Sequence, residues 1–217
     1  MREQFGLAVV MLSLFVDPPS GAFQFSIHNV VGVVADSHGS PVAGASVEAF
    51  PIEKVASAGH LSWVRTGKDG EFRLTLRSGR YVIRAKDEKN GFPDPNFLLS
   101  SDPTAKFPEI SVNDADVSGV RVGLGTKGGI IEGVLRDEGT RQIVSQGKVT
   151  ITDAQNPSVF VEVPVDKLAH FEFTVPKKPI RVSATAPGYS TAYFGKNEQM
   201  TLTEGERRRV EIYLKAK

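Results

Sequence analysis

Residues 31–50, VGVVADSHGSPVAGASVEAF, decide the fold. A β-branched run leads into a dense turn cluster, and residues 46–50 then alternate apolar with polar side chains, as a half-buried strand does. Residues 68–85, KDGEFRLTLRSGRYVIRA, repeat this plan, and their Asp-Gly pair accepts the positive φ that a tight turn needs. The two stretches predict short β-strands that are joined by tight turns.

The alternation also predicts which side chains face the core. Beyond the N-terminal segment no stretch has a convincing amphipathic helix pattern, and turns recur about every eight to twelve residues, as they do in β-sandwiches. We therefore expect an all-β protein made of antiparallel sandwiches. The predicted core residues of the first half are Val47, Phe72, Leu74, Tyr81 and Ile83.

A weaker copy of the same pattern begins near Ile130. Residues 132–137, EGVLRD, correspond to 31–36, VGVVAD, and residues 170–173, HFEF, correspond to 71–74, EFRL. A repeat of about 100 residues favours a duplicated domain over a solenoid of short repeats. The predicted core residues of this copy are Val149, Ile151, Phe171, Phe173, Ile180, Val182 and Ile212.

The N-terminal segment predicts the compartment. Residues 5–16 are an uncharged apolar run of 12 residues with an arginine before it and small residues after it, which is typical of a secretory signal peptide. The alternative is a buried N-terminal helix or strand. The run is too short to span a bilayer, so we expect no transmembrane span in the mature chain. The predicted segments are a signal peptide at 1–22, a first sandwich at 23–125, a glycine-rich linker at 126–129 that permits bending, and a second, divergent sandwich at 130–217.

The motif residues of the first half resemble the carboxypeptidase regulatory-like domain, a transthyretin-like Greek-key sandwich. The second half departs from this pattern, because Leu168-Ala169 stands where Asp-Gly is expected, although Ala186-Pro-Gly-Tyr189 fits the family's usual ending. The resemblance implies two tandem sandwiches that are accessory and non-catalytic, with motif residues that are structural. These residues are Gly32, Val34, Asp36, Gly39, Pro41, Val42, Gly44, Ala45, Val47, Thr66, Asp69, Gly70, Phe72, Leu74, Gly79, Tyr81, Ile83 and Ala85.

Composition and spacing exclude several kinds of chemistry. The formal net charge is +1 with acids and bases interspersed, so we expect no nucleic-acid partner, and the chain has no cysteine for a disulfide, a thiolate site or a nucleophile. The four histidines have no metal-ligand spacing, and no nucleophile motif is present. We therefore expect no catalytic residue, no metal and no cofactor, and we do not expect an enzyme.

Three groups of apolar residues are candidates for a ligand or partner surface. Trp63, the only tryptophan, is expected to be half-buried, and the alternative is an exposed ring that stacks on a sugar. Phe92, Phe97 and Leu98 lie in the proline-rich stretch 90–106, whose prolines disfavour a helix. They either fold onto the sandwich or form a contact surface. The third group is Tyr193 and Phe194.

These observations favour a non-enzymatic binding or scaffolding protein of the cell envelope, secreted or periplasmic. Its expected partner is a protein or a glycan at the envelope. The alternative function is that of a carbohydrate-binding module that uses Trp63 and the loops near it.

Overall fold

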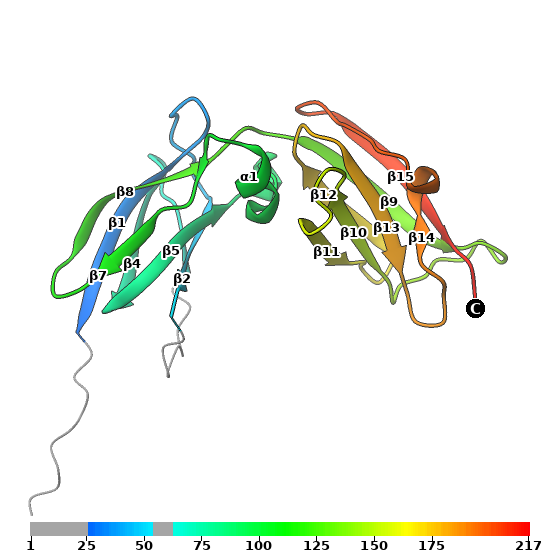
Figure 1. Cartoon of the computed structure of the whole chain (residues 1–217), viewed down its shortest axis with the longest axis horizontal. Coiled ribbons are helices and arrows are strands. Elements are labelled where there is room, and N and C mark those ends of the chain that lie inside the picture. The colour runs from blue at the N-terminus through cyan, green and yellow to red at the C-terminus, as the bar shows by residue number, and fades with distance from the viewer. Residues whose placement is uncertain (1–25, 54–62) are drawn as a thin grey trace, which may run out of the picture.

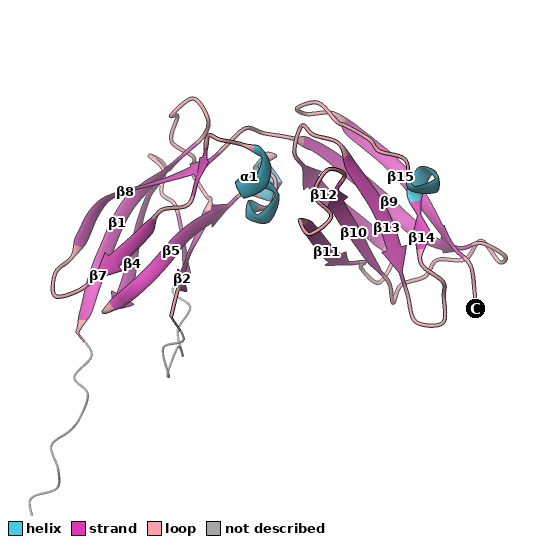
Figure 2. Ribbon diagram, viewed as in Figure 1, coloured by secondary structure: helices cyan, strands magenta, loops and turns pink. Residues whose placement is uncertain are grey.

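The computed structural model describes residues 26–53 and 63–217, so the predicted signal peptide and His60 lie outside the described residues. Figure 1 shows two β-rich units with the short helix α1 between them, and Figure 2 shows that nearly all regular structure is strand. The all-β prediction is confirmed. Among the described residues, no helix is long and apolar enough to cross a membrane.

The first unit contains two four-stranded sheets, ordered β4-β1-β8-β6 and β3-β2-β5-β7. Its period-two segments form strands because their apolar side chains bury on one face only. The strands are β1 (Ile27–Ala35), β2 (Ser46–Pro51), β3 (Trp63–Arg65), β4 (Glu71–Arg77), β5 (Gly79–Lys86), β6 (Ala105–Lys106), β7 (Glu109–Val112) and β8 (Val117–Leu124).

The second unit contains a three-stranded sheet, β12-β9-β15, and a four-stranded sheet, β11-β10-β13-β14. It also carries the short helix η2 (Phe194–Asn197). The strands are β9 (Gly129–Asp137), β10 (Lys148–Asp153), β11 (Phe160–Pro164), β12 (His170–Val175), β13 (Ile180–Thr185), β14 (Ala192–Tyr193) and β15 (Arg207–Leu214).

The two units pair their strands in the same way. In the first, β1 is antiparallel to β4 and parallel to β8, and in the second, β9 is antiparallel to β12 and parallel to β15. One sheet in each unit is therefore mixed, where we expected purely antiparallel sheets, and the other sheet of each unit is antiparallel as expected. The parallel pair arises because the last strand of each unit enters from the opposite sheet and lies beside the first strand in the same direction.

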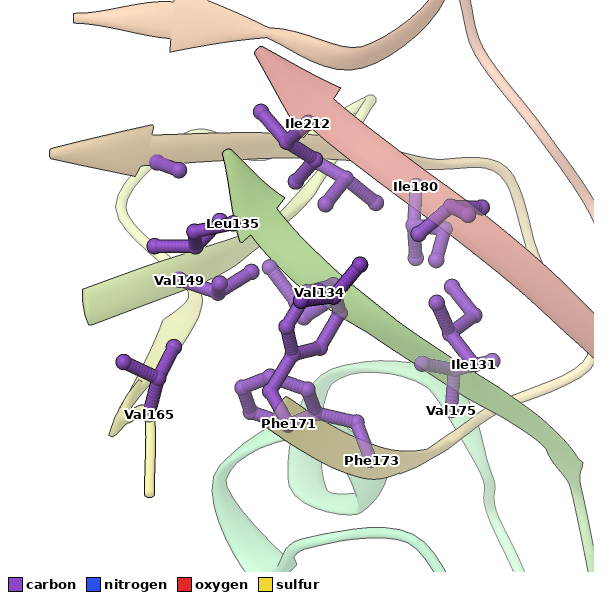
Figure 3. Close-up of a cluster of buried hydrophobic side chains, with 14 of the residues drawn as sticks. Ile131, Val134, Leu135, Val149, Val165, Phe171, Phe173, Val175, Ile180 and Ile212 are labelled. Carbon is purple, nitrogen blue, oxygen red and sulfur yellow. The ribbon is translucent and has the colours of Figure 1, made fainter. Parts of the chain in front are cut away.

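The predicted core is confirmed in both units. Every predicted core residue is at most 9% exposed. In the second unit the rings of Phe171 and Phe173 pack edge-to-face with centroids 6.2 Å apart. Figure 3 shows these two rings beneath β9, with Ile180 and Ile212 on the other side of the same cluster. The burial follows from alternation alone, because residues two apart on a strand share a face.

A glycine in the first strand of each unit permits close packing from two sides. A Cβ atom at Gly32 would lie 2.2 Å from the Val120 carbonyl oxygen and 2.6 Å from the Phe72 ring. A Cβ atom at Gly133 would lie 2.3 Å from the Val210 carbonyl oxygen and 2.7 Å from the Phe171 ring. Only glycine fits either position, since both the neighbouring strand and the core ring occupy the side-chain space.

The proline-rich stretch 90–106 contains a helix, so our expectation that its prolines disfavour one was wrong. Helix α1 (Pro95–Ser101) has Pro95 in its first turn and Asp94 as its N-cap, and the Asp94 side chain accepts a hydrogen bond from the Asn96 N–H at 2.8 Å. Proline is well tolerated at the first helical position, where its missing N–H has no intrahelical partner. A short 3-10 helix, η1 (Glu88–Asn90), precedes it.

The apolar residues around α1 are buried, which corrects the contact-surface interpretation. Phe92, Phe97 and Leu98 are 2%, 2% and 1% exposed, so they present no free surface to a partner. Phe92 belongs to the first core, whereas Phe97 belongs to the core cluster of the second unit. Helix α1 lies between β5 and β6 of the first unit in sequence, but its Phe97 side chain packs in the core of the second unit.

Hydrogen bonds fix the segment that joins the two units. One Asp102 carboxylate oxygen accepts the N–H and hydroxyl of Thr126 at 2.7 and 2.8 Å, and the other accepts the N–H and hydroxyl of Thr104 at 2.8 and 2.5 Å. The Gly128 N–H donates to the Gly91 carbonyl at 2.9 Å. A Cβ atom at Gly128 would lie 1.8 Å from the Val175 carbonyl oxygen. The glycine here serves close packing, where we expected a bendable linker.

We expect Gly32→Ala to destabilise the first unit by about 3 kcal/mol, because overpacking against backbone cannot relax easily. Denaturant unfolding followed by circular dichroism measures this change. The matched control is Gly67→Ala, whose Cβ would meet only the Glu71 carbonyl oxygen at 3.9 Å and should change the stability by about 1 kcal/mol or less. Equal stabilities for the two variants would contradict the close-approach argument.

We call residues 125–128, which join the two units, the junction. We expect Asp102→Ala to loosen the junction, because it removes the acceptor of the Thr126 hydrogen bonds. Small-angle X-ray scattering should show a larger radius of gyration, and proteolysis near residues 125–128 should become faster. Asp114→Ala, which removes an exposed carboxylate elsewhere in the first unit, is the control and should change neither quantity.

The same junction should depend on pH. Burial alone would raise the pKa of Asp102, but hydrogen bonds from Thr104 and Thr126 outweigh it and hold the pKa below its usual value. A carboxylate with a lowered folded-state pKa stabilises above the unfolded value of about 3.9 and loses that contribution as pH falls through the folded value. The native junction should therefore loosen only in acid below about pH 4, and loosening of the native protein already at pH 6 would contradict this assignment.

Candidate functional site

Three side chains form a row across the outer face of the β3-β2-β5 strands. Glu48 on β2 is directly opposite Trp63 on β3 and directly opposite Arg84 on β5. Directly opposite residues lie on the same face of a sheet, so these three side chains project together, away from the core. Phe50, two residues along β2 from Glu48, shares that face.

The guanidinium of Arg84 stacks on the ring of Phe50, with its central carbon 4.9 Å from the ring centroid. This contact is a cation–π interaction, and it holds the planar guanidinium in one orientation. The Nε of Arg84 is buried and has no hydrogen-bond partner among the described residues. The stack therefore presents a positively charged guanidinium of fixed orientation on this face of the sheet.

A hollow of about 120 Å³ lies against this wall. Strands β2 and β5 line it with Glu48, Phe50, Arg84 and Lys86, and α1 lines its other side together with the N-cap residue Asp94. The two cations and the two carboxylates lie around one small space. Such a lining offers both donors and acceptors to a ligand, with an aromatic ring at one side.

Trp63 is 62% exposed at the edge of this sheet, so the half-buried position that we expected for it was wrong. It lies opposite Glu48 and outside the lining of the hollow. The hollow and the exposed indole together form the candidate site, and we call this surface the Trp63 face: Glu48, Phe50, Trp63, Arg84, Lys86 and Asp94.

The other predicted surface residues lie elsewhere. Tyr193 is 54% exposed on β14 of the second unit, and Phe194 is half-buried against the second core. They are not brought together with Trp63, because β14 and η2 belong to the second unit. The sequence had not singled out Glu48, Phe50, Arg84 or Lys86. Their alternation placed them on an outer face, but only strand register brings them into one row.

A second hollow, of about 400 Å³, lies on the β12-β9-β15 sheet and combines His170 with acidic residues and Arg209. Its two glutamates, Glu132 and Glu172, are already bound by Arg207 at 2.9 and 3.3 Å. Its lining contains no serine, threonine or lysine nucleophile. Within residues 26–53 and 63–217, no group of three or more His, Asp or Glu side chains is placed to hold a metal ion.

Several solved structures are distantly similar to this chain. The Bacillus anthracis TIE protein is 16% identical, with 88% of this chain and 34% of that chain covered and a TM-score of 0.36. The Streptococcal ancillary pilin is 14% identical, with 88% and 62% covered and a TM-score of 0.39. The shaft pilin SpaA from Lactobacillus rhamnosus GG is 11% identical, with 88% and 98% covered and a TM-score of 0.34. The chain spans about a third of the TIE chain and about three fifths of the ancillary pilin chain.

No curated protein matches the chain. The family model of the carboxypeptidase regulatory-like domain matches residues 29–124, which contain the motif residues of the first unit. The membership of residues 130–217 in this family stays a prediction. Residues 29–124 are thus identified as a carboxypeptidase regulatory-like domain, as their sequence motifs predicted.

Proposed function

We propose that this protein is a non-enzymatic binding and scaffolding protein of the cell envelope, secreted or periplasmic. The observation that carries the proposal is the Trp63 face, where an exposed indole stands beside a hollow that is lined by two cations and two carboxylates. Tryptophan is enriched among the residues that contribute most to binding at protein interfaces. The predicted signal peptide supports a location outside the cytoplasm.

The junction supports a scaffolding role. Phe97 and the Asp102 hydrogen bonds attach the second unit to the first without a free linker. A partner held on the Trp63 face would therefore keep a defined position relative to the second unit. This is the property that a spacer or scaffold needs, because a flexible linker would spread the bound partner over many positions.

Carbohydrate binding is the second candidate function. One specific observation favours it: the indole of Trp63 is exposed beside the hollow. An exposed aromatic ring offers an apolar face to the C–H groups of sugars. A protein partner would instead require a larger contact, of about 800 Å² on each side for a stable complex, centred on the same indole.

We expect the immobilised protein to retain a defined component from a solubilised envelope fraction, and we expect Trp63→Ala to reduce that retention at least about tenfold. The matched control is Phe160→Ala, because Phe160 is 50% exposed and lies, like Trp63, at the start of an edge strand. Unchanged melting temperatures for both variants would show that the fold is intact. Absence of any retained component, or equal losses in both variants, would contradict the proposal.

A further inference from the structure

We infer that the hollow of the Trp63 face is a subsite for one sugar ring of a neutral glycan, and that Trp63 stacks on the next ring. The inference rests on the proposed binding function and names the chemical class of the ligand. It is carried by the lining of the hollow, by the free indole beside it and by the helix that forms its far side.

The balance of charge in the hollow favours an uncharged occupant. Arg84 and Lys86 supply two cations, and Glu48 and Asp94 supply two carboxylates, so the formal charges cancel. A purely anionic ligand would meet both carboxylates, and a purely cationic ligand would meet both cations. Hydroxyl groups both donate and accept hydrogen bonds, so a polyhydroxylated ring can use the donors and the acceptors of this lining at once.

The hollow holds only part of a ligand. Its volume of about 120 Å³ is below the roughly 300 to 1,000 Å³ of ordinary small-molecule pockets. Its Phe50 ring is already occupied by the Arg84 guanidinium, whereas the indole of Trp63 is mostly open to solvent. One ring in the hollow and one on the indole require a ligand of at least two linked rings, which a glycan provides.

Helix α1 makes this site depend on the second unit. Asp94 and the first two residues of α1 line the hollow. Phe97, the third residue of α1, is buried in the core of the second unit. Asp94 is held by its bond to the Asn96 N–H, so its carboxylate moves with the helix. Phe97 is thus a positioning residue for the site, although it lines no part of the hollow.

Trp63 is the only tryptophan in the chain, so its fluorescence reports on this face alone. The full-length protein is titrated with neutral oligosaccharides of glucose, mannose, xylose and N-acetylglucosamine, and with an acidic oligogalacturonate as comparison. We expect a saturable change in emission and protection from iodide quenching with at least one neutral oligosaccharide, and a weaker response to the acidic one.

Variants locate the site. Arg84→Met preserves an apolar contact with Phe50 but removes the hydrogen-bond donors, and we expect it to weaken the response about tenfold. Arg73→Met, on the exposed side of the other sheet, is its control and should leave the response unchanged. Phe97→Ala should weaken binding about fivefold while Trp63 stays exposed, and melting curves identify any variant that fails to fold.

The outcomes separate this inference from the proposed function. Retention of an envelope protein through Trp63, with no response to any neutral oligosaccharide, would overturn the glycan assignment and leave the binding function standing. Preference for the acidic oligosaccharide, or equal responses in Arg84→Met and Arg73→Met, would also overturn it. Failure of both retention and titration would remove both proposals.

Discussion

The rest of the structure depends on one steric constraint, the missing side chain at the centre of the first strand in each unit. At Gly32 the neighbouring parallel strand approaches from the side while the Phe72 ring fills the core below, and neither contact leaves room for a Cβ atom. Gly133 has the same relation to Val210 and Phe171. The absence of a side chain at these two positions permits the close parallel pairing of the first and last strands over a core ring in each unit.

The candidate site lies on the exposed outer face of one sheet of the first unit. The sheet that contains β2 has an outer face, and the register of β3, β2 and β5 brings Trp63, Glu48 and Arg84 into one row on it. The stretch 90–106 then contributes α1, which borders the same face and the second unit. The candidate site is therefore a consequence of strand register and of one inserted helix.

The sequence was sufficient where a local rule governs the outcome. Alternation placed Val47, Phe72 and Ile83 in the core correctly, because a strand buries every second residue. It failed at Pro95, where a residue that breaks helices internally starts one after an Asp cap. It could not place Phe97, whose partners are on strands of the other unit, and it could not reveal the row at Trp63, because register depends on contacts distant in sequence.

The junction shows why glycine content alone is a poor guide to flexibility. Residues 125–128 contain two glycines, yet Gly128 packs against the Val175 carbonyl and donates to Gly91, and Thr126 is held by Asp102. Glycine there allows two backbones to approach, as it does at Gly32. The packing that orders the junction also positions α1, and α1 borders the Trp63 face, so the shape of this face depends on the contact between the two units.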